Sequence, residues 1–208
     1  MAIKGLSIPV FGKYTFTAST GAVSYSDGVI NPKAVSYSVS VEAGDNNPLR
    51  ADNKIAENDR PKFASGTLTL ETDDLDADIA KLLLGLKEVT RTVGSSSVTA
   101  LLYDDDQKSI AVGVGVIEEH QINDVDKYKA VILKKVTFNV PEDAATTRGE
   151  SISWQTKTIE GNIERSEEEV TAGTGTPAEL HAWKEEAWFD TESAALAYLK
   201  AMLGVSDT

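Results

Sequence analysis

The sequence predicts a mainly β protein, an antiparallel β-sandwich or small barrel with one flanking helix and a C-terminal helix. In residues 33–42, valines and a tyrosine alternate with serines, which is typical of an antiparallel strand with one solvated face. Residues 109–122 and 127–140 have the pattern of two long strands in a hairpin. Helical spacing of apolar residues occurs at about 74–85 and about 191–203. We therefore expect antiparallel strands to form the body of the protein.

The length and composition favour a single domain, residues 1–208. A chain of 208 residues buries roughly 70% of its unfolded surface, so it needs no disulfide or metal to fold. Cysteine is absent, which excludes disulfides, thiol catalysis and Cys-ligated metal sites. The first twelve residues lack the apolar run of a signal peptide, and no stretch of about 18 apolar residues occurs in the chain. We expect neither a secretion signal nor a membrane span.

The charge balance is strongly acidic, with 33 Asp and Glu against 20 Lys and Arg and a net charge of -13. Binding of nucleic acid by phosphate neutralisation requires clustered cations, so this balance argues against it. Two interpretations of the charge remain. It keeps the protein soluble at high concentration, or it lets a surface face DNA without binding it.

The beginning of the chain is predicted to form strands joined by turns. Residues 8–17 are rich in β-branched and aromatic residues, and Gly12 marks a predicted bulge. Residues 19–32 contain several turn formers. Within them, the pair Asp27–Gly28 predicts a tight turn, because both residues tolerate a positive φ.

Residues 63–85 are predicted to organise the fold as one strand followed directly by one helix. In the strand, Leu68 and Leu70 share a face, and threonines occupy the other. Asp73 is the expected N-cap of a helix that starts at Asp74, and Gly85 is the expected left-handed C-cap. The apolar stripe of this helix must pack against the sheet, through Leu75, Ile79, Leu82 and Leu83.

Residues 43–62 form a long polar stretch with two prolines, which we predict to be a loop. One interpretation is a mobile surface loop. The other is an arm that becomes ordered against another subunit, anchored by Leu49 and Ile55, its large apolar residues. In this interpretation the candidate intersubunit residues are Asn46, Leu49, Arg50, Asn53, Ile55 and Arg60.

The second half of the chain continues the β pattern. Strands are predicted at 87–92, 98–103 and 150–163, with a flexible break at 94–97. The sequence VILKK interrupts the alternation in the second long strand and predicts a bulge. In the first long strand, Gly113 and Gly115 lie on the face opposite the valines. They either admit a closely approaching neighbour or mark a bulge.

The C-terminal segment, residues 172–208, is predicted to end in a helix capped by Asp190 or Thr191. Trp183 and Trp188 precede this helix among charged residues. The favoured interpretation is that both tryptophans fill a small core beside the helix. The alternative is that they are exposed contact residues for a ligand.

The sequence contains little that indicates catalysis. The two histidines, His120 and His181, have no recognisable spacing to a nucleophile or to a second metal ligand. The acidic clusters at 73–78 and 104–106 lack the alternating ligands and central glycine of a calcium loop, and are predicted to be a helix N-terminus and a solvated turn. No phosphate-binding glycine motif occurs. We therefore expect a protein that is not an enzyme, with no catalytic residue, metal or cofactor.

Several segments resemble the major tail proteins, or tail tube proteins, of long-tailed, non-contractile bacteriophages. The central motif is LRADNKIAEND followed by FASGTLTLETDDLDADIAKLLLG, at residues 49–59 and 63–85. GESISWQTKTIEGNI, at 149–163, resembles a later segment of the same family. AWFDTESAALAYLKAML, at 187–203, resembles its C-terminal helix. The resemblance spans most of residues 35–203.

The resemblance implies a subunit of the tail tube with a tail-tube fold. Such subunits form hexameric rings that stack around a tape-measure protein and join tail terminator and distal tail or baseplate proteins. DNA then slides through the lumen during ejection without specific binding, and an acidic lumen suits this passage. By the same resemblance, residues 43–62 are the arm that reaches an adjacent subunit or ring. The implied location is the virion tail, after synthesis in the host cytoplasm.

Two other classes of function remain as alternatives. A β-sandwich binding module on a virion or cell surface would recognise glycan or protein, with Trp183 and Trp188 as contact residues. An enzyme is the least supported class, because the residues offer no catalytic constellation.

Overall fold

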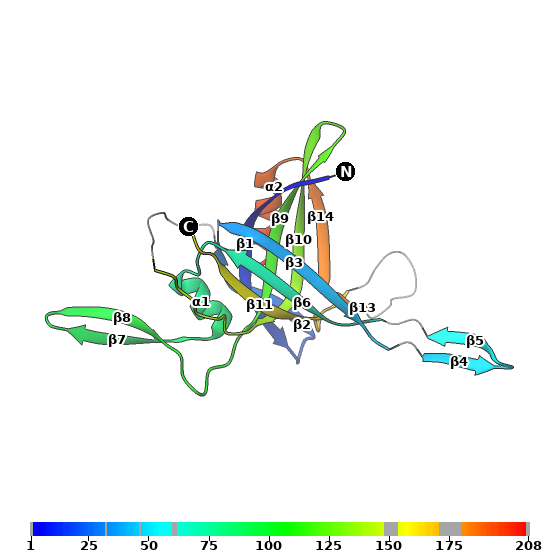
Figure 1. The fold of residues 1–208 in the computed structure, drawn as a ribbon, viewed down its shortest axis with the longest axis horizontal. Helices are drawn as coiled ribbons and strands as arrows, with labels where there is room; N and C mark the ends of the chain where they lie inside the picture. The colour runs from blue at the N-terminus through cyan, green and yellow to red at the C-terminus, as the bar shows by residue number, and fades with distance from the viewer. Residues whose placement is uncertain are drawn as a thin grey trace.

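The protein is a two-layer antiparallel β structure with two helices, as the computed structural model shows (Figure 1). The structure describes residues 2–31, 33–45, 47–59, 62–147, 154–170 and 180–206. The sequence-based prediction of the fold class is confirmed: strands dominate, the sheets are antiparallel, and the helices flank them.

One eight-stranded sheet forms the body, and its connectivity is antiparallel throughout. Along the sheet the strands follow the order β2 (Ala22–Ile30), β1 (Ala2–Thr17), β9 (Ala111–Ile122), β10 (Val125–Phe138), β11 (Lys157–Glu164), β6 (Phe63–Thr72) and β3 (Ala34–Ala43), and β14 (Lys184–Phe189) also pairs with β10.

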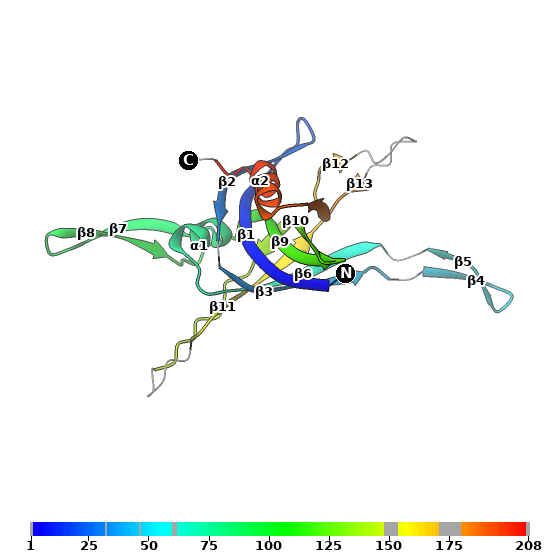
Figure 2. The same cartoon turned by 90° about the horizontal axis from the view of Figure 1, so that it is seen from above.

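The sheet folds into two layers because β10 changes partner along its length. Its first half pairs with β14 through Leu133, and its end pairs with β11 from Lys135 onward. Between them the register with β9 shifts, at the bulge that VILKK predicts. As a result β2, β1, β9, β10 and β14 form the first layer, and β11, β6 and β3 form the second layer (Figures 1 and 2).

Two apolar clusters stabilise this arrangement. The larger cluster lies between the layers, where Phe11, Val114, Leu70, Ile159 and residues of the first helix are buried together. The smaller cluster lies on the outer face of the first layer, under the C-terminal helix α2 (Glu192–Met202). The first layer is therefore buried on both faces, and the second layer on one.

Gly113 and Gly115 show why α2 lies so close to the first layer. A Cβ at Gly115 would stand 2.9 Å from both the Leu199 Cδ2 and the Leu203 Cδ1 atoms. A Cβ at Gly113 would approach Leu203 Cδ2 to 2.6 Å. Close approach is found at both glycines, by Leu199 and Leu203 and, at Gly113, also by Tyr25 of β2, whose Cε1 would stand 2.5 Å from the Cβ. Gly113 also lies opposite the bulge in β10, between the Val114–Leu133 and Val112–Val136 pairs, so the second alternative holds there as well.

The first helix, α1 (Ala77–Leu84), begins three residues later than predicted. Asp76 is its N-cap, and Asp73 is not. The reason is that the Asp73 carboxylate is engaged before the helix, accepting a hydrogen bond from the Asp74 N–H at 2.9 Å and pairing with Lys33 at 2.8 Å. Gly85 confirms the predicted C-cap, with a φ of 64° and its N–H bound to the Lys81 carbonyl.

The C-terminal helix starts as predicted. The Thr191 side chain accepts a hydrogen bond from the Ala194 N–H at 3.2 Å, so Thr191, and not Asp190, is the N-cap.

The pair Asp27–Gly28 does not form the predicted tight turn. It lies inside β2, at an irregularity opposite Gly12, which confirms the bulge predicted there. The C-terminal tail explains the glycine, because a Cβ at Gly28 would stand 2.6 Å from the Val205 N atom. The Gly28 N–H instead donates to the Gly204 carbonyl at 3.1 Å. The turn between β1 and β2 lies at residues 18–21.

Residues 43–62 are not the predicted loop. They contain a hairpin of β4 (Asn47–Ala51) and β5 (Lys54–Asp59), whose turn residues Asp52 and Asn53 both have positive φ. A second hairpin consists of β7 (Lys87–Val93) and β8 (Ser96–Leu102). Its turn contains Gly94, with a φ of 63°, so the predicted flexible break at 94–97 is wrong.

Residues 157–164 are the part of the predicted strand 150–163 that the structure shows as β11. Residues 150–153 lie outside the described residues, and 154–156 are not in a strand. The remaining short strands are β12 (Glu169–Val170) and β13 (Leu180–His181), which pair with each other.

Candidate assembly and conduit surfaces

The outer face of the second layer carries several cross-strand rows of small polar and acidic side chains, which together we call the polar wall. Three rows of cross-strand neighbours begin it: Ser36–Glu71–Thr158, Ser38–Thr69–Glu160 and Ser40–Thr67–Asn162. Glu42, Ser65 and Glu164 extend it at one end. None of these twelve residues is a lysine or arginine.

Strand alternation places these residues on the outside. In β11, Ile159, Gly161 and Ile163 point inward and are buried, so Thr158, Glu160 and Asn162 must point outward and are exposed. The same alternation holds in β6, where Leu68 and Leu70 belong to the core. The residues that lie between the core residues along each strand are therefore the ones that form the wall.

Two carboxylates of the wall, those of Glu71 and Glu42, accept hydrogen bonds from hydroxyl groups. Ser36 donates to Glu71 at 2.9 Å, and Ser65 donates to Glu42 at 3.2 Å. The hydrogen bonds from Thr156 and Ser36 lower the pKa of Glu71. Glu71 is therefore an anion at neutral pH, and the wall has negative potential.

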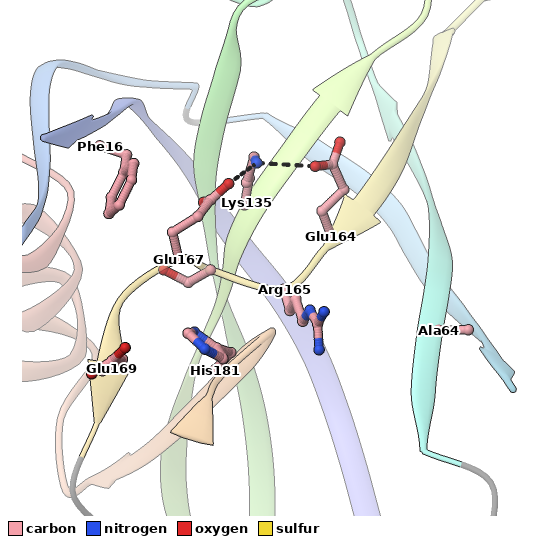
Figure 3. A pocket seen from close by; sticks show the side chains of 9 residues that line it. Phe16, Ala64, Lys135, Glu164, Arg165, Glu167, Glu169 and His181 are labelled. Carbon is pink, nitrogen blue, oxygen red and sulfur yellow. Dashed lines mark hydrogen bonds and ion pairs between the residues drawn. The ribbon is translucent and has the colours of Figure 1, made fainter. Parts of the chain in front are cut away.

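A groove opens at the end of the wall, with a volume of about 580 Å³ (Figure 3). Figure 3 shows Lys135 between two carboxylates, 3.0 Å from Glu164 and 2.7 Å from Glu167. Burial lowers the pKa of Lys135, but these two partners outweigh it, so the pKa is raised overall. Phe16, Ala64, Arg165, Ser166, Glu169 and His181 complete the lining.

Glu167 is positioned in the groove by two hydrogen bonds with Tyr14. The Tyr14 hydroxyl donates to its carboxylate at 2.5 Å, and the Glu167 N–H donates to that hydroxyl at 3.0 Å. Burial raises the pKa of Glu167, and the hydrogen bonds from Lys135 and Tyr14 lower it by more. The contacts of Lys135 and Glu167 therefore join β1, β10 and the segment after β11 across the groove.

A second charged cluster is buried between the layers and includes His120. The Glu118 carboxylate lies 2.6 Å from Lys129 Nζ and 2.9 Å from His120 Nε2, and the Tyr37 hydroxyl also donates to it. Burial raises the pKa of Glu118, but the hydrogen bonds from Lys129, Tyr37 and His120 lower it by more. Trp188 covers His120, with ring centroids 4.8 Å apart. The cluster joins β3 of the second layer to β9 and β10 of the first.

The residues predicted for the arm lie on the β4–β5 hairpin. Leu49 is 62% exposed and Ile55 is 54% exposed, so the described residues leave more than half of each apolar anchor open to solvent. Arg50 and Asn53 are exposed as well. Asn46 and Arg60 lie outside the described residues. The hairpin projects from the body on the side opposite the β7–β8 hairpin in both views (Figures 1 and 2).

The helix residues predicted to pack lie in the main core. Ile79, Leu82 and Leu83 of α1 are buried there, and Leu75, just before the helix, packs against the same cluster.

The tryptophans do not fill a core beside α2 as favoured above. Trp183 stacks on Phe63 with ring centroids 4.7 Å apart and packs against the core between the layers. Trp188 is 45% exposed. The reason is that β14 pairs with β10 and carries Trp188 to the rim of the body, away from the helix core.

Sequence reasoning missed two surfaces. It read the strands of the wall separately, although the alternation of Ser, Thr and Glu in each was visible. Their common face depends on the register of β3, β6 and β11. It also predicted the strands at 87–92 and 98–103 without predicting that they pair as the β7–β8 hairpin, whose signal was the Gly94–Ser95 pair between two β-patterned runs.

Comparison with protein-family models finds no matching family, and comparison with curated proteins finds no significant match. Within the described residues, no group of acidic or histidine side chains is arranged to hold a metal ion. Neither of the two helices in this part of the chain has the length and apolarity needed to cross a membrane.

Proposed function

We propose that this protein is a structural subunit that assembles with copies of itself into stacked rings, forming the tail tube of a phage through which DNA is ejected. The observation that carries the proposal is the polar wall, a solvated sheet face with twelve small polar or acidic residues and no cation. The negative charge of such a wall repels the phosphates of DNA, and the wall has no lysine or arginine that could pair with them.

The projecting hairpins support self-assembly. A two-stranded hairpin is marginally stable alone in water, yet both hairpins extend away from the sheet and expose apolar side chains. In the proposed tube, Leu49 and Ile55 of the β4–β5 hairpin contact an adjacent subunit, and the wall lines the lumen. The resemblance to phage major tail proteins favours six subunits in each ring, with tape-measure, terminator and distal tail proteins as further partners.

The proposed lumenal position of the wall can be tested by substituting lysines into it. The purified protein is expected to form rings or hollow tubes in negative-stain micrographs. Tubes of Thr67→Lys/Thr158→Lys are expected to hold DNA in a nuclease-protected, salt-sensitive form, because the lysines then face the lumen. The matched control is Ala197→Lys/Ala201→Lys on the exposed face of α2, which should bind DNA without protecting it.

Two results would count against the proposal. Wild-type protein that forms neither rings nor tubes at any concentration contradicts the assembly function. Tubes whose wall lysines bind only nuclease-accessible DNA contradict the lumenal position of the wall.

The arm is tested by its removal. Replacing residues 47–59 with a short Gly-Ser turn should leave a folded monomer, because the hairpin forms a sheet of its own, separate from the body. Tube growth should be lost, since the Leu49 and Ile55 contacts are gone. Micrographs and circular dichroism check both points, and normal tubes from this variant would disprove the role of the arm.

A glycan- or protein-binding module is the second candidate, favoured by the half-exposed Trp188. Trp188 lines a groove of about 440 Å³ with Ile122, Lys127, Phe189, Asp190, Thr191 and Ala194. Binding of a glycan by the monomer that Trp188→Ala abolishes, in protein that does not assemble, would support this candidate over the tube.

A further inference from the structure

We infer that the β7–β8 hairpin is a second docking arm, and that its apolar face packs against another copy of this chain. The inference rests on the proposed self-assembly and goes beyond it, because the arm predicted from the sequence is the β4–β5 hairpin. It names a different element, on the other side of the body, as an intersubunit contact.

The two faces of this hairpin differ in chemistry. Cross-strand pairing puts Val93 opposite Ser96, Arg91 opposite Val98, and Val89 opposite Ala100. These residues share one face with Leu102 and with Lys87, which pairs with Leu102. Because its other side chains are mostly apolar, we call this the apolar face of the hairpin. The other face carries Glu88, Thr90, Thr92, Ser97, Thr99 and Leu101. A hairpin in water gains nothing from such asymmetry unless one face is covered.

Most of the apolar face is exposed to solvent, whereas Val89 and Ala100 on the same face are half-buried. Val93 is 66% exposed, Val98 is 51% exposed and Leu102 is 37% exposed. The two strands form a sheet of their own and pair with no other strand. Seven residues per strand give a reach of roughly 23 Å, so the tip extends well beyond α1.

The root of the hairpin is fixed, which gives the arm a defined direction. Leu101 packs against the core between the layers. Lys87 pairs with Asp104 at 2.7 Å, and Glu88 pairs with Lys81 of α1 at 2.8 Å. A hairpin that is anchored at its base and exposed toward its tip is preorganised for binding, because it loses little conformational entropy when a partner binds.

Charge identifies the occupant as a second copy. Arg91 lies in the middle of the apolar face and has no hydrogen bond or ion pair to any described residue, whereas Lys87 is already paired. An unpaired arginine among valines is typical of the centre of a protein interface. The surface that best receives it is acidic, and this chain has a net charge of -13.

The test measures self-association of the full chain by sedimentation velocity, together with micrographs of the same samples. Val98→Asp should raise the concentration of half-association roughly tenfold or more, because it puts a carboxylate in the apolar contact. The matched control is Thr99→Asp, the adjacent residue on the opposite face, which should associate like wild type. The monomers should keep their melting temperature to within about 2 °C, since both positions are exposed.

Arg91→Glu is a second variant, which keeps the apolar residues and reverses the charge; it should weaken association in the same direction. Association of Val98→Asp and Arg91→Glu at wild-type concentrations would overturn the inference and leave the tube proposal intact. Oligomers that are sensitive to Val98→Asp but never form rings or tubes would support the inference and refute the tube. Wild-type protein that is monomeric at every concentration would refute both.

Discussion

The two layers of the sandwich are built from the same kind of antiparallel strand, yet they differ in how many faces they bury. In β9 of the first layer, residues 112–118 are buried without interruption, because the second layer covers one face and α2 covers the other. In β11 of the second layer, buried and exposed residues alternate strictly. The second layer therefore leaves one face exposed to solvent, whereas the first layer is buried on both faces.

The largest expected effect comes from removing a side chain under α2. Leu199 is fully buried against the first layer, so Leu199→Ala should lower the free energy of unfolding by about 3 kcal/mol. The counterpart on the free face of the second layer is Thr69→Ala, which should change it by less than about 0.5 kcal/mol. Urea denaturation measures both. An equal loss of unfolding free energy in the two variants would contradict the difference in burial between the two layers.

A smaller effect is expected where charges join the layers. Glu118→Gln removes the nearer anion of the largely buried Lys129 and leaves only Glu186, at 3.7 Å, so it should cost about 2 kcal/mol at neutral pH. The folded-state pKa of Glu118 lies below its usual value of 4.5, so its contribution is present above pH 4.5 and is lost as pH falls through the lower folded value. The stability difference between wild type and variant should therefore shrink below pH 4.5.

The control for this prediction is Glu186→Gln, which removes a carboxylate that lies 3.7 Å from Lys129 and is more exposed than Glu118. Tyr37, His120, Lys129 and Glu186 are the titratable groups around Glu118, and Glu186 is the one whose removal leaves the Lys129–Glu118 pair in place. Thermal unfolding from pH 3 to pH 7 measures both variants. A difference between wild type and Glu118→Gln that stays constant over this range would contradict the assigned role of the carboxylate.

Strands and caps could be predicted where the information is local. The alternation in β6 and the caps at Gly85 and Thr191 depend on neighbours within a few residues, and the structure has them as expected. The alternation in β3 is found only in part, because Tyr37 and Val39 pack against the core while Val35 and Val41 are exposed. The predicted start of α1 was wrong because Asp73 forms an ion pair with Lys33, forty residues away in the sequence. The turn at Asp27–Gly28 was wrong because the C-terminal tail lies against Gly28. Both errors come from contacts between distant segments.

The candidate surfaces were less accessible to sequence reasoning. The residues of the β4–β5 hairpin were selected as an arm for their polarity and two apolar residues, but the Asp52–Asn53 turn that pairs the strands was not recognised. The polar wall needs the register of three strands, which joins residues as far apart as Ser38 and Glu160. The apolar face of β7–β8 needs cross-strand pairing to bring Arg91 beside Val98.

The sequence by itself determined the antiparallel β class, the two helices and the acidic balance without cysteine, because periodicity and composition are properties of short windows or of the whole chain. Only the tertiary structure shows which strands are covered on both faces and which on one. The bulge in β10 splits its pairing between β14 and β11 and so separates the layers, and two glycines in β9 let α2 cover the first layer. Among the described residues no helix lies on the outer face of the second layer, and the registers of β3, β6 and β11 bring Ser, Thr and Glu residues from distant parts of the sequence together there as the polar wall.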